Sequence, residues 1–181
     1  VVSKPDVLQA IGAHMTGLIS TEPINEIQDG LESLGCLLLD RICTIDQVRG
    51  LERAAEHGYE KVAVTIAGNR AFQAKSLREL GMAQGILPFI LAVHTTGISE
   101  AEAILLAEQC DIVWACASKS VRDVVGKRSK LQIGVSIPVF ALTDQGKRMV
   151  LNRALHFSEG LVIHQASLPQ VPKEKQPHPL I

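Results

Sequence analysis

The stretch Ile86-Leu87-Pro88-Phe89-Ile90-Leu91-Ala92-Val93 decides the fold, because it is a continuous apolar run that stops at a histidine. Strands that are covered on both faces have apolar runs of this kind. Four such β-rich runs begin at residues 36, 61, 86 and 111, and they are Cys36 to Leu39, Lys61 to Ile66, Ile86 to Val93 and Asp111 to Ala115. The constant interval is about the length that a strand, a turn, a helix and a return loop need. The sequence therefore predicts a series of βα units.

Helix signals lie between these runs. Thr44-Ile45-Asp46-Gln47 and Ser99-Glu100-Ala101-Glu102 are typical of capping boxes, in which the first hydroxyl and the fourth side chain each satisfy a free amide. Gly35, Gly58 and Gly81 follow the expected ends of three helices, where a left-handed residue is common. Caps and apolar spacing together predict helices over residues 5–18, 23–34, 44–57, 71–80, 99–109, 120–125 and 147–157.

A fifth apolar run, Leu131 to Leu142, contains Pro138, which cannot donate to a β ladder and so marks a strand start, an edge or a bulge. The whole pattern predicts an α/β fold with a mainly parallel open sheet of about five strands. Helices are expected on both faces, in a Rossmann-like arrangement of three layers. Strand residues in such a sheet should be nearly all buried, and eight of them test this expectation: Cys36, Leu38, Val62, Val64, Ile90, Val93, Ile112 and Val113.

The length of 181 residues favours one domain, which we expect to cover residues 1–164. The tail over residues 165–181 carries Pro169, Pro172, Pro177 and Pro179, and this composition favours an extended arm. We expect the tail to make few contacts with its own domain and to lie on a neighbouring chain, as in a homo-oligomer. The opening Val1-Val2-Ser3 resembles the end of a strand, which predicts a fragment or a processed chain.

Charge and composition exclude several classes of protein. A formal net charge of −1 gives no global field that would attract a nucleic acid. The apolar runs end well short of the roughly 20 residues that a membrane span requires, and no signal peptide pattern opens the chain. Four cysteines without a paired CxxC spacing argue against a disulfide framework and against a structural zinc site. We therefore expect a cytoplasmic protein with reduced thiols.

Ligands of a doubly wound sheet bind outside the carboxyl ends of the strands, so the loops after the strands are the candidate site. Two of these loops have small or hydroxyl side chains before a helix, whose first amides favour an anion. Five cations lie within twelve residues of the second loop. They indicate either a phosphate or carboxylate site, or an ordinary solvated basic face. The candidate ligand-binding residues are Thr95, Thr96, Gly97, Ser118, Lys119 and Ser120.

His94 and Cys116 follow the third and fourth runs and are candidates for catalysis or for metal binding. They could meet as a thiolate–imidazole pair or as two ligands of one metal, with Cys43, Asp40 or His14 completing the set. The alternative is a buried cysteine and a histidine bound to backbone. Lys119 is the third catalytic candidate, and the sequence leaves the cofactor unknown.

Six segments resemble the methanogenesis marker protein 8 family of archaea, and they occur in the order expected for it. They are residues 8–18, 45–48, 92–97, 115–119, 126–128 and 136–143, within a resemblance that runs from Val1 to Ala154. The resemblance implies an organism that makes methane through methyl-coenzyme M reductase. It also implies that a further N-terminal region of the family is missing here and that this chain is the C-terminal part. It supplies no catalytic residues.

Three functions remain open from the sequence. The first is an accessory protein of methanogenesis that assists assembly or activation of methyl-coenzyme M reductase and binds a phosphorylated or carboxylated small molecule. The second is an enzyme of methanogenic cofactor metabolism that uses His94, Cys116 and Lys119. The third is a protein-interaction module that acts through the proline-rich tail. A pocket shared by these three side chains would favour the enzyme, and a filled strand-end crevice would favour the interaction module.

Overall fold

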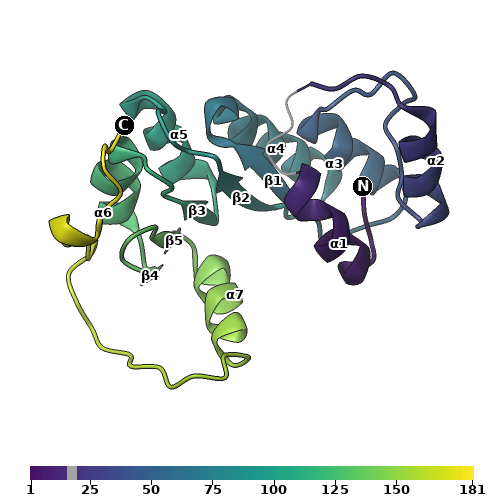
Figure 1. Ribbon diagram of the computed structural model, residues 1–181. Helices are drawn as coiled ribbons and strands as arrows, with labels where there is room; N and C mark the ends of the chain where they lie inside the picture. The colour runs from purple at the N-terminus through teal and green to yellow at the C-terminus, as the bar shows by residue number, and fades with distance from the viewer. Residues whose placement is uncertain (16–19) are drawn as a thin grey trace.

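The computed structural model describes residues 1–15 and 20–181, apart from the side chains of residues 5 and 12–15, and within them the fold is a mixed α/β fold (Figure 1). The helices are α1 (Pro5–Met15), α2 (Asn25–Ser33), α3 (Gln47–Glu56), α4 (Phe72–Gln84), α5 (Glu100–Gln109), α6 (Gly126–Arg128) and α7 (Asp144–Ala154). The strands are β1 (Ala63–Ala67), β2 (Phe89–Val93), β3 (Ile112–Trp114), β4 (Leu131–Ile133) and β5 (Val139–Ala141). Short turns of other helix types are η1 (Gly68–Arg70), the π-helical η2 (Val121–Val125) and η3 (Lys173–Lys175).

The five strands form one open sheet in the order β1-β2-β3-β5-β4. The pairs β1–β2 and β2–β3 are parallel, whereas β3–β5 and β4–β5 are antiparallel. The sheet is therefore mixed, and the prediction of a mainly parallel, Rossmann-like sheet is not confirmed. The reason lies in the fifth apolar run, which forms two strands on either side of Pro138. Their connection is too short for the crossover that a parallel pair requires, so β5 runs back along β4.

The strand predicted over Cys36 to Leu39 is wrong. Leu37 instead exchanges two backbone hydrogen bonds with Val1, of 2.7 and 2.8 Å, and the segment does not join the sheet. The predicted burial of the eight strand residues is largely confirmed, since none of them is exposed. Five of them are buried and three are half-buried, namely Leu38, Val62 and Val93.

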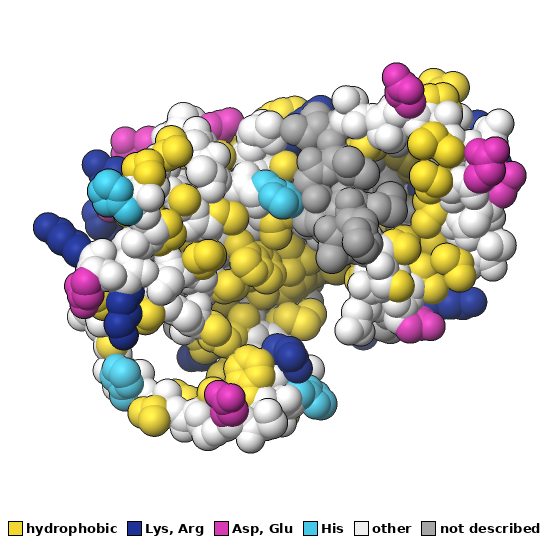
Figure 2. Space-filling view, in the orientation of Figure 1, with side chains coloured by type: hydrophobic (Ala, Val, Ile, Leu, Met, Phe, Trp, Pro, Cys, Tyr) yellow, Lys and Arg dark blue, Asp and Glu magenta, His cyan; other side chains and the backbone are white. Residues whose placement is uncertain are grey.

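The two faces of the sheet are covered unequally. One face packs against α3, α4, α5 and η2 around a large core that contains Leu51, Leu77, Ile90, Leu106 and Phe140. The other face holds a smaller cluster in which Val150 of α7 packs with Phe89, Ile112 and Ala141. Hydrophobic side chains remain visible there over the middle of the sheet (Figure 2). No helix among the described residues is long and apolar enough to cross a membrane.

The helix predictions are mostly confirmed, and the errors concern helix ends and the type of one helix. The helix predicted over residues 147–157 is α7 at residues 144–154, and residues 121–125 of the helix predicted over 120–125 form the π-helical η2. The capping box of Ser99 and Glu102 forms as expected at the start of α5. At the start of α3, however, Asp46 caps the helix by accepting from the amides of Val48 and Arg49, so the cap lies two residues after Thr44. The end of the first predicted helix, residues 16–18, lies outside the described part of the chain.

Gly81, expected just past a helix end, lies inside α4, which continues to Gln84 and ends at Gly85 with a left-handed φ of 68°. A Cβ on Gly81 would come within 2.5 Å of Pro88 Cδ and 2.7 Å of the Ile86 carbonyl oxygen. Close packing against the entry to β2, and not left-handed backbone, therefore requires this glycine.

The tail runs back along its own domain, and the prediction that it makes few contacts there is wrong. After α7 the chain makes a wide arc and then returns past α6 toward α5 (Figure 1). Residues 156–167 of the arc are all exposed. The returning segment forms hydrogen bonds with the domain through Gln170, Gln176 and Ile181. Side-chain amides and backbone groups supply these contacts, which the proline pattern does not reveal.

Candidate functional site

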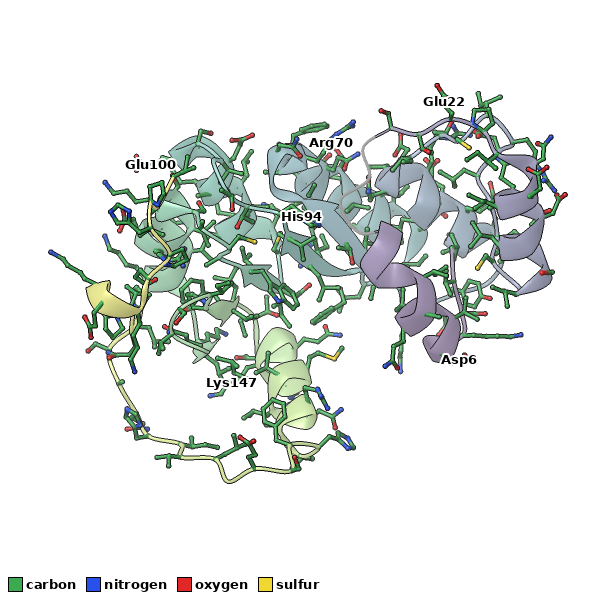
Figure 3. The ribbon with its side chains drawn as sticks, in the orientation of Figure 1. Asp6, Glu22, Arg70, His94, Glu100 and Lys147 are labelled. Atoms are coloured by element: carbon green, nitrogen blue, oxygen red, sulfur yellow. The ribbon has the colours of Figure 1, made fainter. Side chains whose placement is uncertain are left out.

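The loops that follow β2 and β3 lie side by side, as their parallel pairing requires. The Thr95 hydroxyl donates to the Trp114 carbonyl at 2.6 Å, and the Ala117 amide donates to Thr96 Oγ1 at 3.1 Å. Two segments that are far apart in the sequence therefore meet at one edge of the sheet. Figure 3 shows His94 at the end of β2, near the middle of the molecule.

The hydroxyl groups expected to bind a ligand are largely used inside the protein. Thr95 and Ser118 are fully buried, and Ser118 Oγ accepts from the Val121 amide at 3.2 Å. Thr96 is exposed and Ser120 is half-buried, while Gly97 is exposed with a left-handed φ of 77°. Thr95 and Ser118 thus shape the two loops. The exposed residues of the predicted set are Thr96, Gly97 and Lys119.

A capping box uses part of the start of α5, where the sequence predicted an anion site. Ser99 Oγ accepts from the Glu102 amide, and the Glu102 carboxylate accepts from the Ser99 amide at 2.7 Å. This capping box satisfies two of the free amides and places a negative charge at the helix start. An anion would be opposed there by the carboxylate of Glu102.

The five cations of the predicted basic patch separate into three environments. Arg128 pairs with Glu108 at 3.7 Å, and Lys130 pairs with Asp144 at 2.8 Å. Arg122 is buried. Only Lys119 and Lys127 among the five remain free of an ion pair within 4 Å in the part of the chain that the structure describes.

Lys119 and Lys127 line one open cleft of about 470 Å³ together with Glu100, Ser120, Asp123 and Val124. Figure 3 shows Glu100 at the start of α5, on the same side of the molecule as the end of the tail. Two ammonium groups and two carboxylates therefore surround the cleft. A small anion bound between the lysines would gain charge-assisted hydrogen bonds, and a second anionic group would be opposed by the carboxylates.

Arg122 is a central residue of this region that the sequence did not single out. Its guanidinium is only 3% exposed and donates to the carbonyls of Ala115, Cys116, Ser118 and Ser136 and to the Gln176 side chain. Burial lowers the pKa of Arg122, and the neighbouring Cys116 opposes this shift. In the sequence, Arg122 is indistinguishable from the exposed cations around it.

His94 and Cys116 have matching backbone conformations at the two strand ends, with left-handed φ values of 53° and 46°. Non-glycine residues adopt this conformation rarely, so both loops are locally strained. No hydrogen bond in the described structure joins the side chains of His94, Cys116 and Lys119. Of these three residues, Lys119 alone lines the cleft described above.

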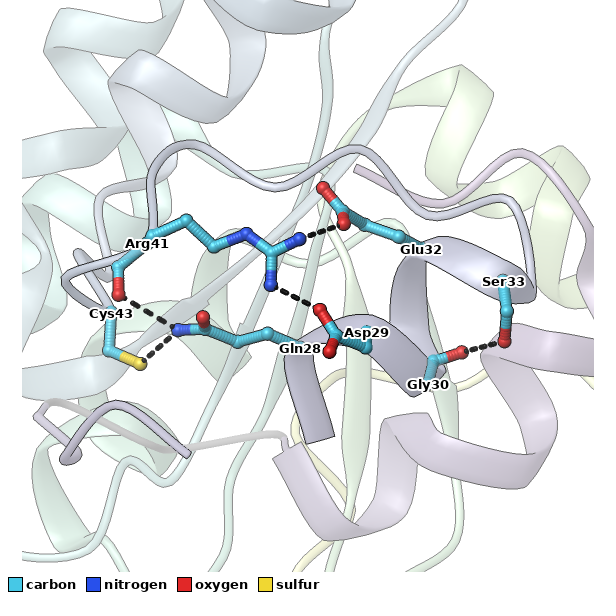
Figure 4. A network of polar contacts seen from close by, with 7 residues as sticks. All are labelled: Gln28, Asp29, Gly30, Glu32, Ser33, Arg41 and Cys43. Carbon is cyan, nitrogen blue, oxygen red and sulfur yellow. Dashed lines mark hydrogen bonds and ion pairs between the residues drawn. The ribbon is translucent and has the colours of Figure 1, made fainter. Parts of the chain in front are cut away.

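The metal site considered for His94 and Cys116 is not found in the described residues, where no group of three or more His, Cys, Asp or Glu could hold an ion. The side chain of His14 lies outside that part. Cys43 accepts from Gln28 Nε2 at 2.9 Å, in a network that also joins Arg41 to Asp29 and Glu32 (Figure 4). Asp40 accepts from the amides of Ile42 and Thr44, and the Thr44 contacts lower its pKa.

The end of the tail occupies the crevice between the two loops. The Ile181 amide donates to the Ala117 carbonyl at 2.9 Å, and the Lys119 amide donates to the Ile181 carbonyl at 2.8 Å. Gly97 lies close by, because a Cβ there would meet Ile181 Cγ2 at 3.8 Å. A filled strand-end crevice is the observation expected of an interaction module.

Comparison with known proteins places the chain in a family. Residues 1–155 match the family model described as "Uncharacterized protein conserved in archaea (DUF2099)". The chain is also 38% identical over 183 residues to uncharacterized protein MJ0054 of Methanocaldococcus jannaschii. That alignment covers 100% of this chain and 62% of the relative, so the chain spans about three fifths of the relative's length. No solved structure matches the chain. The extent of the match shows that the chain belongs to this archaeal family of conserved proteins.

Proposed function

We propose that the chain is an accessory protein of methanogenesis that assists the assembly or activation of methyl-coenzyme M reductase. It binds a phosphorylated or carboxylated small molecule beside the carboxyl ends of β2 and β3. The archaeal family and the resemblance to methanogenesis marker protein 8 support the setting. The cleft lined by Lys119 and Lys127 supports the ligand.

The observation that carries the ligand is the cleft that Lys119 and Lys127 line together. In the described structure neither lysine has an ion-pair partner within 4 Å, whereas the neighbouring cations Arg128 and Lys130 do. Exposed lysines without an ion pair also occur elsewhere, as at Lys147, so the shared cleft is what distinguishes this pair. Glu100 and Asp123 restrict the ligand to one with a single compact anionic group.

The ligand is tested by calorimetric titration with inorganic phosphate. Charge-assisted hydrogen bonds contribute about 1.5–3 kcal/mol, so Lys119→Ala should weaken binding roughly tenfold to a hundredfold and leave the fold intact. Lys147→Ala removes an exposed cation from α7, which is remote from the cleft in Figure 3, and should bind as the wild type does. Equal binding by Lys119→Ala and the wild type, or no binding by either, would contradict the anion site.

The setting is tested in a methanogen by native mass spectrometry of the protein purified under mild conditions. Spectra should contain complexes with methyl-coenzyme M reductase subunits or with proteins that act on them, and bound small molecules should add discrete masses. The same spectra report whether copies of the chain associate. Complexes that contain only proteins unrelated to methanogenesis would contradict the assignment.

The interaction module is a second candidate, because the tail is seated in the strand-end crevice. Backbone groups of Ala117 and Lys119 bind the Ile181 backbone in the manner of an added strand. Recognition of this kind requires no reactive side chain. An accessory protein can combine it with a small-molecule site, since the charged cleft lies beside the crevice and is not filled by these contacts.

A further inference from the structure

Residues 169–181 contact the domain along a strip formed by η2, β4 and the loops after β3 and β4, which we call the groove. Figure 1 shows this segment returning past α6. They are held at points spread over the whole segment. Pro169 packs at one end, Gln176 binds in the middle, and Ile181 binds at the other end. The domain therefore binds this segment at points along its length, and the segment includes the 3-10 turn η3 immediately before Gln176.

The middle contact recognises a carboxamide. Arg122 Nε donates to Gln176 Oε1 at 2.7 Å, and Gln176 Nε2 donates to the Val135 carbonyl at 2.8 Å. A donor and an acceptor are thus presented to one side chain, and a primary carboxamide matches both. A carboxylate has no hydrogen to give to the Val135 carbonyl, and an aliphatic side chain would leave Arg122 Nε without its acceptor.

The donor is fixed before any peptide binds. The other nitrogens of the Arg122 guanidinium donate to four backbone carbonyls, at distances from 2.8 to 3.4 Å. They hold Nε at the groove with little freedom to rotate away. A buried donor that loses its acceptor is costly, so this position discriminates strongly against side chains that cannot accept.

The contacts at the ends are independent of the peptide's side chains. Gln132 donates to the Gln170 carbonyl at 2.7 Å and accepts from the Gln170 amide at 2.8 Å. Ile181 binds through its amide and carbonyl alone. Backbone contacts of this kind supply affinity for any extended segment, and side-chain pockets supply specificity.

Pro169 is a second residue of the tail whose side chain is closely packed against the domain. It rests on Gly126, where an added Cβ would come within 2.9 Å of the proline ring. The absence of a side chain at Gly126 makes a shallow socket. The groove thus suits a peptide with a proline seven residues before a glutamine.

The tail is attached loosely to the rest of the chain. Residues 156–167 are exposed throughout, so no packing in the arc holds the tail in place. We propose that the groove is a peptide-binding site for a segment of another protein that carries a proline and, after a short turn like η3, a glutamine side chain, and that the tail occupies it as an internal ligand. The proposal does not depend on an anion in the neighbouring cleft.

The test uses a labelled peptide with the sequence of residues 168–181 and the full chain carrying Pro169→Gly and Gln176→Ala. These changes weaken the chain's own tail and leave the groove unaltered. The peptide should bind this variant at least tenfold more tightly than the wild-type chain, whose tail competes at a high effective concentration. Fluorescence anisotropy measures both affinities, and circular dichroism verifies the fold of each variant.

Altered peptides test the chemistry. A peptide with Gln176→Leu keeps the size of the side chain and should bind at least tenfold more weakly, since it loses the hydrogen bonds to Arg122 and Val135 as well as the one to Pro172 within the tail. Gln132→Ala, added to the chain with the weakened tail, should also weaken binding of the unaltered peptide, because Gln132 binds the backbone of Gln170. Equal binding of the Gln176→Leu peptide, or tighter binding of a Gln176→Glu peptide, would overturn carboxamide recognition. No binding of any peptide to the weakened-tail variant would overturn the groove itself.

Discussion

Arg78 and Asp111 form an ion pair between a half-buried guanidinium and a buried carboxylate, in which Arg78 Nη2 lies 2.8 Å from Asp111 Oδ2. The same carboxylate accepts from the Ile90 amide at 2.7 Å and from the Thr143 hydroxyl at 2.6 Å. Arg78 also donates to the Pro88 carbonyl at 2.6 Å. The Asp111 carboxylate and the Arg78 guanidinium therefore join α4, β2 and the start of β3 to Thr143, the residue that caps α7. This network lies at the amino end of β3, whereas the candidate site lies at its carboxyl end.

Asp111→Ala should lower the free energy of unfolding by about 3–5 kcal/mol, because it leaves the Arg78 charge and the Ile90 amide without their acceptor. Chemical denaturation of the purified variants measures this change. Glu79→Gln is the control and lies on α4, the helix that carries Arg78. Glu79 pairs with Lys75 at 3.8 Å, and both side chains are 65% exposed. Exposed pairs contribute about 0–1 kcal/mol. Similar losses in both variants would show that the Asp111 network does not stabilise the fold.

Two helical glycines should respond oppositely to alanine. Gly81→Ala forces a Cβ into Pro88 and the Ile86 carbonyl, and overpacking of this kind costs about 1–3 kcal/mol. Gly50 lies inside α3, where an added Cβ would meet nothing within 4 Å, so Gly50→Ala should stabilise the protein by about 0.5–1 kcal/mol. Thermal unfolding measures both shifts. A stabilising Gly81→Ala would contradict the close packing of α4 on the entry to β2.

The local elements could be predicted because their signals are local. The Ser99 capping box and the apolar run that contains β2 each depend on residues close together in the sequence. The direction of β5 depends instead on the length of a connection and on Pro138, and in the sequence these two strands form one interrupted apolar run. The Cys36 to Leu39 run has strand composition, but its partner is Val1 and not the sheet. Strand composition alone does not identify the strand's neighbour.

The candidate site was also predictable only where it depends on the order of the strands, and not where it depends on packing. The sequence located the two loops after β2 and β3, since the carboxyl ends of parallel strands meet at one edge. It could not distinguish Arg122 from Lys119, because burial of one cation and exposure of another follow from packing on η2. It also could not place Gln176 on Arg122, which is 54 residues away in the chain.

Stability should decline at alkaline pH through Cys110. This thiol is 1% exposed, and burial raises its pKa from 9.0 to about 12, with Arg78 opposing the shift. Below pH 9 the thiol is protonated in both the folded and the unfolded chain, so its contribution is fully present. Above pH 9 the unfolded chain loses the proton first, and the free energy of unfolding falls as the pH approaches 12.

Cys110→Ala should flatten this decline, which denaturation at a series of pH values measures. Val150→Ala is the control, because it removes core volume on the other face of the sheet and retains the thiol. It should be less stable than the wild type at every pH and keep the wild-type slope. An unchanged slope in Cys110→Ala would exclude this thiol as the source of the alkaline decline.

Thr95 has a buried hydroxyl that donates to the Trp114 carbonyl and so joins the loop after β2 to the end of β3. Thr95→Val keeps the shape of the side chain but leaves that carbonyl without its donor, which should cost about 1–3 kcal/mol of unfolding free energy. Thr65→Val changes an exposed position of β1, where a β-branched apolar residue is well tolerated, and should be nearly neutral.

If the two loops form one site, Thr95→Val should also weaken phosphate binding at a temperature where the variant is fully folded, because Lys119 is positioned by the loop that Thr95 holds. Phosphate affinity equal to the wild type in a destabilised Thr95→Val variant would show that the loop contact stabilises the fold without shaping the cleft.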